Sequence, residues 1–220
     1  MKLGVLFSGG KDSTYSAWLA KKLGYELSCL ISIWSENKES FMFHTPAIEI
    51  TKKQAELVGV PIIVQKTRGK KEKELLDLEK AIKLAIKKYK IEGIVTGAVE
   101  SVYQSSRIQQ ICNSLGVECF NPLWQKNQAE LLEELVKNKF EIILSGVFSY
   151  PLDKGWVGRK IDSNFIKEIK ILSEKYKINP AGEGGEFESL VINCPLFKKK
   201  LEVKLLKIVG EGNAWKGEFE

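Results

Sequence analysis

The sequence predicts an α/β protein, with a parallel sheet covered by helices on both faces and a smaller mixed α+β region at the C-terminal end. Strand-like and helix-like segments alternate from the first residues to about Tyr150, an order typical of parallel sheets. Several strand-like segments, such as Leu3–Phe7 and Leu27–Ile33, are continuously apolar, as strands buried on both faces are. After Tyr150 one helix is followed by strand-like runs, which indicates a separate mixed region.

Apolar spacing and glycine stop signals define the elements of the first half. The segment Glu72–Tyr89 places apolar residues three or four positions apart, the pattern of an amphipathic helix. Gly24 and Gly116 follow the last apolar positions of two other helices and mark their ends. The expected strands are Leu3–Phe7, Leu27–Ile33, Pro61–Gln65, Ile94–Gly97 and Val117–Phe120, and the expected helices are Asp12–Leu23, Ala47–Val58, Glu72–Tyr89 and Val102–Leu115.

The start of the second half echoes a segment of the first. KYKIEGIVTGAV, from Lys88, and KNKFEIILSGVF, from Lys137, each show a helix end, a buried strand and then a glycine. We therefore interpret Ile94–Gly97 and Phe140–Val147 as equivalent strands. The remaining expected elements are the helices Gln128–Lys137 and Ser163–Tyr176 and the strands Phe187–Asn193, Leu201–Val209 and Ala214–Phe219, the last completing a small antiparallel unit.

Composition places the chain among folded, water-soluble proteins. Of its 220 residues 44% are hydrophobic and 28% are charged, which argues against wholesale disorder. No run of about 18 apolar residues occurs, so we expect no membrane span. The apolar stretch at the N-terminus is too short for the core of a signal peptide. We therefore expect a cytoplasmic protein.

Cysteine and charge usage argue against several kinds of site and partner. The four cysteines are scattered without a CxxC pair, and the chain has one histidine, so we expect neither a zinc site nor a disulfide framework. The formal net charge of +6 is modest, and lysine- and glutamate-rich surfaces are common without nucleic acid. We expect no direct nucleic-acid partner; an acidic protein surface fits the charge as well. The sequence leaves a homo-oligomer open.

The segment SGGKDS, from Ser8 to Ser13, follows the first expected strand and opens the first expected helix. Gly9 and Gly10 can present backbone N–H groups to an anion without a side chain in the way. The helix N-terminus adds about half a positive charge and Lys11 a whole one. The adjacent glycines distinguish this loop from the Walker A pattern. It therefore predicts a phosphate-binding loop of another kind, in which Ser13 donates a hydroxyl.

Asp12 has two interpretations within this loop, and both stay open. In the first helical turn its carboxylate can satisfy the helix end and the helix dipole. Beside a phosphate cradle, the same carboxylate can ligate Mg²⁺ directly or through water.

SGGKDS after a first strand resembles the pyrophosphate-binding loop of the N-type ATP pyrophosphatases, the PP-loop superfamily. The resemblance implies a Rossmann-like, HUP-type fold and cleavage of ATP into AMP and pyrophosphate, with an adenylated intermediate that a nitrogen or sulfur nucleophile resolves. Gly97 could approach the nucleotide or simply let the chain turn. The expected nucleotide contacts are Ser8, Gly9, Gly10, Lys11, Asp12 and Ser13 in the loop, Ile33 and Trp34 beside the adenine, and Gly97 and Ala98 after the fourth strand.

Four further stretches narrow the family: Phe41–Pro46, Gly97–Trp124, GWVGRKID from Gly155, and GEGGEFESLV from Gly182. Together they resemble the diphthine–ammonia ligases in their short archaeal form, over essentially the whole chain. GEGGEFE is the most specific of them, because other ATP pyrophosphatases lack it; Ser189 stands where threonine is common. The resemblance implies that ATP, with Mg²⁺, adenylates the carboxylate of diphthine on translation elongation factor 2. Ammonia, arriving as ammonium, then displaces AMP to give diphthamide.

The helix after the fourth strand supplies candidate substrate contacts. Tyr103 and Arg107 are four residues apart and share a helix face. The Arg107 guanidinium could brace the α-phosphate or the substrate carboxylate, or form a solvated surface pair. We assign Lys11 and Arg107 as candidate catalytic residues, and Tyr103, Gln104 and His44 as candidate substrate contacts; His44 could equally be packed in the fold.

The acidic glycine loop has a different task, because a phosphate cradle does not favour carboxylates. Diphthine carries a fixed trimethylammonium charge, which suits carboxylates and aromatic faces. We expect Glu183 and Glu186 to bind ammonium or act as the general base, although carboxylates capping a turn would explain them too. The expected neighbours of the quaternary nitrogen and substrate are Trp124, Trp156 and Glu188.

These assignments predict a nucleotide-binding domain over residues 1–125 and a substrate-binding region over 126–220, with Tyr150 as the alternative boundary. Two rival functions remain. A related ATP pyrophosphatase that modifies a tRNA base would favour a basic RNA platform and paired cysteines. A non-enzymatic nucleotide-binding regulator would keep the loop but have little use for Lys11, Arg107 and the acidic loop together.

Overall fold

The computed structural model of the protein describes residues 1–35, 48–68 and 73–220. The internal contacts divide the chain into two compact units, Met1–Trp124 and Gln125–Glu220. The predicted boundary at residues 125 and 126 is adjacent to this division, and Tyr150 lies inside the second unit. Each unit has its own sheet.

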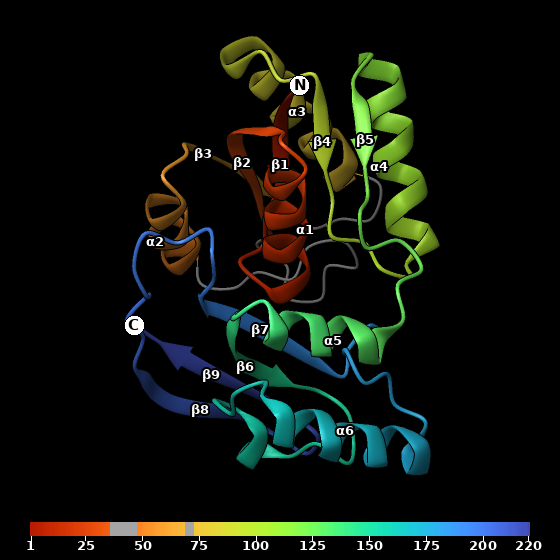
Figure 1. The fold of residues 1–220 in the computed structure, drawn as a ribbon, viewed down its shortest axis with the longest axis vertical. Helices are drawn as coiled ribbons and strands as arrows, with labels where there is room; N and C mark the ends of the chain where they lie inside the picture. The colour runs from red at the N-terminus through yellow and green to blue at the C-terminus, as the bar shows by residue number, and fades with distance from the viewer. Residues whose placement is uncertain (36–47, 69–72) are drawn as a thin grey trace. The chain divides into compact units, whose positions relative to one another are not determined.

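The first unit is built on a parallel sheet whose strand order is β3-β2-β1-β4-β5 (Figure 1). After β1 the chain places β2 and β3 on one side and then returns to place β4 and β5 on the other. The order therefore reverses between β1 and β4, and ligands of such sheets bind at the carboxyl ends of the strands beside this point. The strands are β1 (Lys2–Leu6), β2 (Glu26–Ser35), β3 (Ile62–Thr67), β4 (Gly93–Val95) and β5 (Glu118–Phe120).

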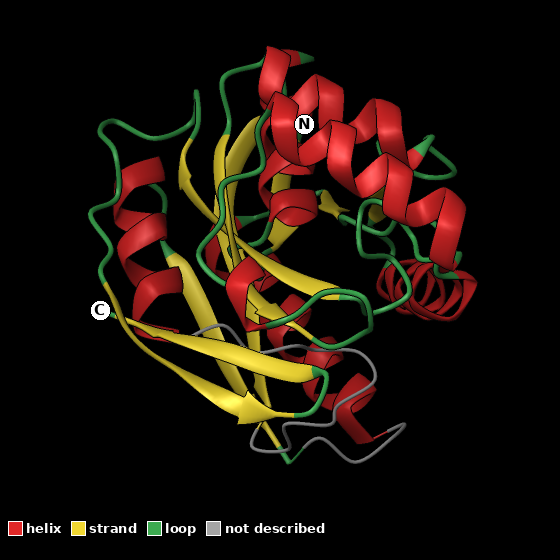
Figure 2. Ribbon diagram, turned by 90° about the horizontal axis from the view of Figure 1, so that it is seen from below, coloured by secondary structure: helices red, strands yellow, loops and turns green. Residues whose placement is uncertain are grey.

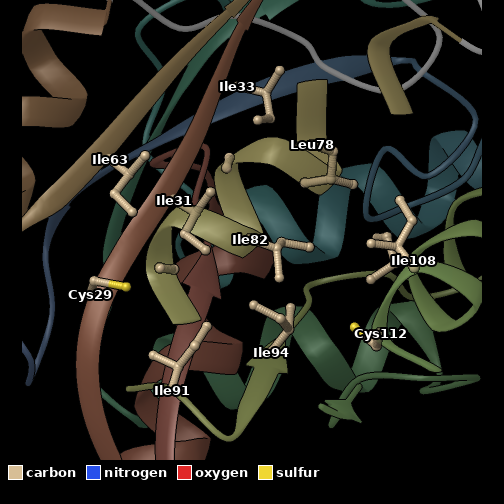
Figure 3. Packing of buried hydrophobic residues seen from close by; sticks show 13 residues of the cluster. Cys29, Ile31, Ile33, Ile63, Leu78, Ile82, Ile91, Ile94, Ile108 and Cys112 are labelled. Carbon is tan, nitrogen blue, oxygen red and sulfur yellow. The ribbon is translucent and has the colours of Figure 1, made fainter. Parts of the chain in front are cut away.

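Helices cover both faces of this sheet. On one face, Leu78 and Ile82 of α3 and Ile108 of α4 pack with Ile31 and Ile94 of the sheet in a buried cluster (Figure 3). On the other face lies α1, whose Tyr15 and Ala20 side chains are buried. The helices are α1 (Lys11–Lys22), α2 (Ile48–Val58), α3 (Lys73–Tyr89) and α4 (Val102–Leu115). The predicted fold class is confirmed.

The second unit carries an antiparallel sheet with the strand order β7-β6-β9-β8. The last two strands form a hairpin next to the C-terminus (Figure 2). The elements are α5 (Gln128–Lys137), β6 (Glu141–Val147), the 3₁₀ helix η1 (Lys154–Trp156), α6 (Ser163–Tyr176), β7 (Phe187–Asn193), β8 (Leu205–Glu211) and β9 (Ala214–Phe219).

One prediction about the sheets is wrong. The two echoing segments were expected to give equivalent strands, but β4 pairs in parallel with β1 and β5, whereas β6 pairs antiparallel with β7 and β9. A helix followed by an apolar strand and a glycine describes local structure only. The sheet that such a strand joins depends on partners distant in sequence, which the local pattern does not specify.

Most local signals at the ends of elements are accurate, although the strand expected over Leu201–Val209 is observed over Leu205–Glu211. Gly116 ends α4 in the left-handed conformation, with φ of 66°, as a glycine stop predicts. The predicted bounds of α5, α6, β7 and β9 coincide with the observed ones. Within the described residues, no helix combines the length and apolarity that crossing a membrane requires.

Candidate active site

The SGGKDS loop lies at the carboxyl end of β1, beside the point where the strand order of the first unit reverses. Gly10 is the N-cap residue of α1 and offers no side-chain hydrogen bond to the first turn. Because the first backbone N–H groups of a helix have no partner within the helix, those of α1 remain available to a ligand. An anion at this position would also meet the positive end of the helix dipole.

Hydroxyl groups hold the loop in shape. Ser8 N–H donates to Ser13 Oγ over 3.2 Å, and the two serine hydroxyls are 3.1 Å apart. The Gly10 carbonyl accepts from Ser13 Oγ at 3.2 Å and from Thr14 Oγ1 at 2.8 Å. Hydrogen bonds within the chain therefore shape the SGGKDS loop before a ligand arrives. This reduces the loss of conformational entropy when a ligand binds.

Lys11 and Asp12 form a contact at the start of α1. The Lys11 side chain is buried, with 4% of the residue exposed, and its Nζ donates to Asp12 Oδ2 over 2.7 Å. Asp12 Oδ1 is buried and has no hydrogen-bond partner among the described residues. Neither carboxylate oxygen caps a backbone N–H of the helix. A buried carboxylate oxygen beside a phosphate loop fits Mg²⁺, which prefers such hard ligands together with phosphate oxygens.

Gly97 brings the end of β4 against the first turn of α1. A Cβ atom at Gly97 would lie 2.8 Å from the Asp12 carbonyl carbon and 2.8 Å from the Ser13 nitrogen, closer than packed atoms come. Glycine is thus required by the contact with the phosphate loop, and not merely to let the chain turn. The following residue, Ala98, is buried, and its N–H donates to Thr96 Oγ1 over 3.2 Å.

The two residues at the end of β2 that were expected beside the adenine differ in their exposure. Ile33 belongs to the buried cluster beneath α3 (Figure 3), so its side chain is not available to border an adenine and only its backbone can face a ligand. Trp34 is partly exposed, and the Lys66 ammonium lies 4.9 Å from its ring centroid. Of the two residues expected beside the adenine, Trp34 is therefore the candidate side chain.

The start of α4 arranges the predicted substrate contacts. The guanidinium carbon of Arg107 lies 3.6 Å from the centroid of the Tyr103 ring, as their spacing of four residues predicts. Ser101 caps the helix by accepting from the Gln104 N–H over 3.3 Å. His44, the remaining predicted substrate contact in this part of the chain, lies outside the described residues.

Sequence analysis missed two polar side chains in this unit. Gln54 of α2 is buried and donates to the Gly9 carbonyl. Asn121 follows β5, beside the end of β4, where Thr96 N–H donates to the Phe120 carbonyl. Both polar atoms of the Asn121 amide are buried and have no hydrogen-bond partner among the described residues. Their signal in the sequence is weak: Asn121 is a polar residue directly after an apolar strand, and Gln54 is a polar residue on the inner face of a helix.

In the second unit, the Glu186 carboxylate holds the acidic loop together. The residue is 6% exposed. Its Oε1 accepts from Asn179 N–H at 2.7 Å and from Asn179 Nδ2 at 3.0 Å, and its Oε2 accepts from Gly184 N–H at 2.9 Å. With both oxygens bound to the chain, Glu186 fits the alternative of a carboxylate capping a turn. Its expected role in binding ammonium or acting as the base stays a prediction.

A glutamine at the start of α5 extends this network. Gln128 Nε2 donates to Asn179 Oδ1 over 3.0 Å, and Gln128 Oε1 accepts from Ala181 N–H at 3.1 Å. The chain of amides and carboxylate ties α5 to the loop. Buried polar groups linked in this way rigidify a structure when their bonds are made.

The other two glutamates lie in more open positions. Glu183 is partly exposed on the loop itself. Glu188 belongs to β7. Its Oε1 lies 3.3 Å from the ammonium nitrogen of Lys216 in β9, the strand on the other side of β6. Glu183 is therefore the carboxylate of the glycine loop placed best to meet a solvent-borne cation.

The two tryptophans expected near a quaternary nitrogen differ in accessibility. Trp124 is exposed at the end of the first unit. Trp156 is 7% exposed, packs edge-to-face on Phe165, and carries the Arg159 guanidinium carbon 4.0 Å from its ring centroid. A cation of the chain itself thus lies over the Trp156 ring, and the role of this buried residue as a substrate contact stays a prediction.

The comparisons with known proteins agree on a family. The model of the diphthamide synthase N-terminal domain matches residues 1–119, and that of the diphthamide synthase C-terminal domain matches residues 127–218. A diphthine–ammonia ligase of Bos taurus is 31% identical over 228 residues, covering 95% of this chain and 85% of that protein. One of Schizosaccharomyces pombe is 31% identical over 217 residues, covering 91% of this chain and 36% of that protein.

Among solved structures, a predicted subunit of tRNA methyltransferase from Methanocaldococcus jannaschii aligns with a TM-score of 0.45 and 22% identity, covering 91% of this chain and 100% of that chain. The family itself is established by the two domain models, which together span both compact units, and by the identity to the bovine enzyme over nearly the whole chain. The chain belongs to the diphthamide synthase family.

Proposed function

We propose that the protein is an ATP-dependent ligase that amidates diphthine on translation elongation factor 2 with ammonia, giving diphthamide, AMP and pyrophosphate. The observation that carries the proposal is the preformed phosphate loop at the strand-order reversal, in a chain whose two units match the two diphthamide synthase domains. Family membership supports the acceptor, and the loop supports the use of ATP.

The reaction needs two displacements. A carboxylate oxygen of diphthine attacks the α-phosphorus, and pyrophosphate leaves. The ammonia nitrogen then attacks the acyl carbon, AMP leaves with that carboxylate oxygen, and the nitrogen loses the protons that the amide does not keep. Because a carboxylate is a poor acyl donor, the adenylate supplies the leaving group, and the enzyme contributes positioning and charge stabilisation.

The first unit supplies the groups for the first displacement. The backbone N–H groups around Gly9 and Gly10, the Ser13 hydroxyl and the Lys11 ammonium would hold the departing pyrophosphate. Asp12 Oδ1, buried and unpartnered among the described residues, would contact Mg²⁺, which neutralises phosphate charge when bound. The Lys11–Asp12 contact keeps that carboxylate in place.

Arg107 is proposed to stabilise the charge that develops at the α-phosphate. Its guanidinium carbon lies over the Tyr103 ring, 3.6 Å from the ring centroid, and this contact would hold the guanidinium in place before the substrate arrives. The Asn121 amide, at the same edge of the sheet, offers a donor and an acceptor to the acceptor carboxylate and to the incoming ammonia.

The second unit is proposed to serve the cationic co-substrates. Glu183 would attract ammonium and take a proton from it, on a loop that Glu186 and Asn179 hold rigid. Glu188 and the exposed Trp124 remain candidates for the trimethylammonium group of diphthine. Cytoplasmic localisation is part of the same proposal, since elongation factor 2 works in the compartment of translation.

The proposal is tested with purified elongation factor 2 in its diphthine form, incubated with ATP, Mg²⁺ and ammonium. Mass spectrometry should show the loss of about one dalton as the acid becomes an amide, with AMP and pyrophosphate released in equal amounts. Bulk tRNA in place of the elongation factor tests the tRNA-modifying alternative. Nucleotide cleavage that depends on tRNA and not on diphthine would overturn the assignment.

A further inference from the structure

A buried glutamine from another element contacts the phosphate loop. Gln54 lies on α2 and is 0% exposed. Its Nε2 donates to the carbonyl oxygen of Gly9 over 3.0 Å, across 45 positions of the chain. A side-chain amide buried to this extent is held by its hydrogen bonds. The bond therefore links α2 to the phosphate loop.

The space beside Gly9 is filled by this glutamine. Gly9 has a φ of 80°, and a Cβ atom there would lie 2.1 Å from Gln54 Oε1. Both facts require glycine at this position, because the left-handed backbone is costly for other residues and the amide leaves no room for a side chain. The Gln54 amide thus lies directly on the Gly9 backbone.

The hydrogen bond also sets the direction of a second group. In a trans peptide unit the C=O and the following N–H point in opposite directions. Since Gln54 draws the Gly9 carbonyl towards α2, the N–H of Gly10 is directed the other way. It lies 3.4 Å from Ser8 Oγ, a long contact that an anionic oxygen can replace with a stronger one.

Glycines on both sides of this peptide leave its orientation weakly determined by local sterics. Rotated by half a turn, the unit would present the Gly9 carbonyl to the ligand, and a carbonyl dipole repels phosphate. The contact with Gln54 opposes that rotation.

We propose that Gln54 is a positioning residue that locks the Gly9–Gly10 peptide with its N–H directed at the bound pyrophosphate moiety. The inference rests on the proposed function in so far as the ligand is the pyrophosphate end of ATP. Loss of the lock removes one charge-assisted hydrogen bond and allows the repulsive orientation, so the affinity for pyrophosphate should fall about 10- to 100-fold.

The test uses the full chain and inorganic pyrophosphate with Mg²⁺, measured by calorimetry. Gln54→Met keeps the length of the side chain without its donor, and Gln54→Glu replaces the donor with an acceptor. Gln109→Met is the matched control, because Gln109 is exposed on α4 and its amide nitrogen donates to Asn113 of the same helix. We expect a 10- to 100-fold loss for Gln54→Met, a larger loss for Gln54→Glu and none for the control.

Two readouts separate positioning from folding and from the ligase reaction. In the wild-type chain, pyrophosphate should shift the amide resonances of Gly10 more than those of Gly24, at the far end of α1. In turnover assays Gln54→Met should raise KM for ATP and leave KM for diphthine unchanged. Wild-type affinity in a folded Gln54→Met, or a Gly10 amide that ignores pyrophosphate, would overturn the inference. A Gln54-dependent affinity in a chain that does not amidate diphthine would instead overturn the proposed function alone.

Discussion

The guanidinium of Arg107 lies over the ring of Tyr103, with 3.6 Å between the guanidinium carbon and the ring centroid. One residue of the pair carries the charge and the other orients it. Arg107→Ala should therefore reduce adenylation by about 100-fold or more, the effect of losing a group that stabilises transition-state charge. Tyr103→Phe keeps the stacking face and should stay near wild type, whereas Tyr103→Leu should lose about tenfold.

Pyrophosphate release in single turnovers measures this difference. Val102→Ala, on the same turn of α4 but exposed, is the control for effects of substitution on the helix. Equal rates for Tyr103→Phe and Tyr103→Leu would show that the ring does not orient the guanidinium.

Asp12→Asn separates the two interpretations of this carboxylate. The amide keeps the shape and removes the charge, so the Mg²⁺ concentration for half-maximal pyrophosphate release should rise about tenfold or more if Oδ1 is a metal contact. Stability should also fall, because the amide no longer neutralises the buried Lys11 ammonium or the helix dipole, so the Mg²⁺ dependence is the readout that separates the two interpretations. Titrating Mg²⁺ at saturating ATP provides the measurement, with Lys21→Met at the end of α1 as a control variant; an unchanged titration curve would refute the metal role.

Gly97→Ala should displace the phosphate loop although the sequence of the loop is unchanged. The added Cβ would lie 2.8 Å from the backbone of Asp12 and Ser13, so the end of β4 or the first turn of α1 must move. We expect a loss of about 1–3 kcal/mol in the free energy of unfolding, as for other overpacked sites, together with weaker ATP binding.

Gly24→Ala is the matched control, because nothing lies within 4 Å of its Cβ and its φ is 87°. It should cost about 1–2 kcal/mol through its backbone conformation alone and leave ATP affinity unchanged. Chemical denaturation and nucleotide calorimetry on both variants provide the comparison. An unaffected ATP affinity in Gly97→Ala would count against the close approach of β4 to the site.

Glu186→Gln should destabilise the acidic loop. The Glu186 carboxylate accepts three hydrogen bonds from the loop. In glutamine one of the two oxygens becomes an NH₂ group, which cannot accept a hydrogen bond, so at least one N–H group of the loop loses its acceptor. A loss of about 1–3 kcal/mol in stability is expected, with faster hydrogen exchange at the amides of Asn179 and Gly184. Glu183→Gln should leave stability nearly unchanged and slow amide formation relative to adenylation. If both variants lost only amide formation, Glu186 would be a reacting group after all.

Among the four cysteines, we expect the Cys119 thiol to react with alkylating reagents at the lowest pH. The S–H of Cys112 donates to Cys119 and lowers the pKa of the Cys119 thiol, while the same contact raises the pKa of Cys112. Burial raises the pKa of Cys29 to about 12 and that of Cys194 to about 11, so both stay protonated near neutral pH. Since the thiolate is the reactive form, mass mapping after brief iodoacetamide treatment at rising pH should show Cys119 modified at the lowest pH. Faster labelling of Cys29 would contradict this order.

Sequence patterns predicted the elements well, because periodicity and glycine stops are local signals. The bounds of α5 and α6 and the position of the phosphate loop at the end of β1 needed nothing beyond neighbouring residues. The sheet that β6 joins could not be predicted in this way, since its partners β7 and β9 lie far along the chain.

The same distinction between local signals and distant partners applies to the candidate site. The roles of Lys11 and Arg107 were proposed from their motifs and stay predictions, whereas the tertiary neighbours of Ile33, Trp156 and Glu186 could not be read from the sequence. Gln54 was missed for the same reason: a glutamine on an amphipathic helix reads as a surface residue until its contact with Gly9 is seen.

Gly10 leaves the first turn of α1 uncapped by any side chain. An anion in the loop would accept hydrogen bonds from the N–H groups of this turn and so act as the missing cap. Binding of nucleotide should therefore raise the melting temperature of the chain, and melting curves recorded at several nucleotide concentrations measure the affinity.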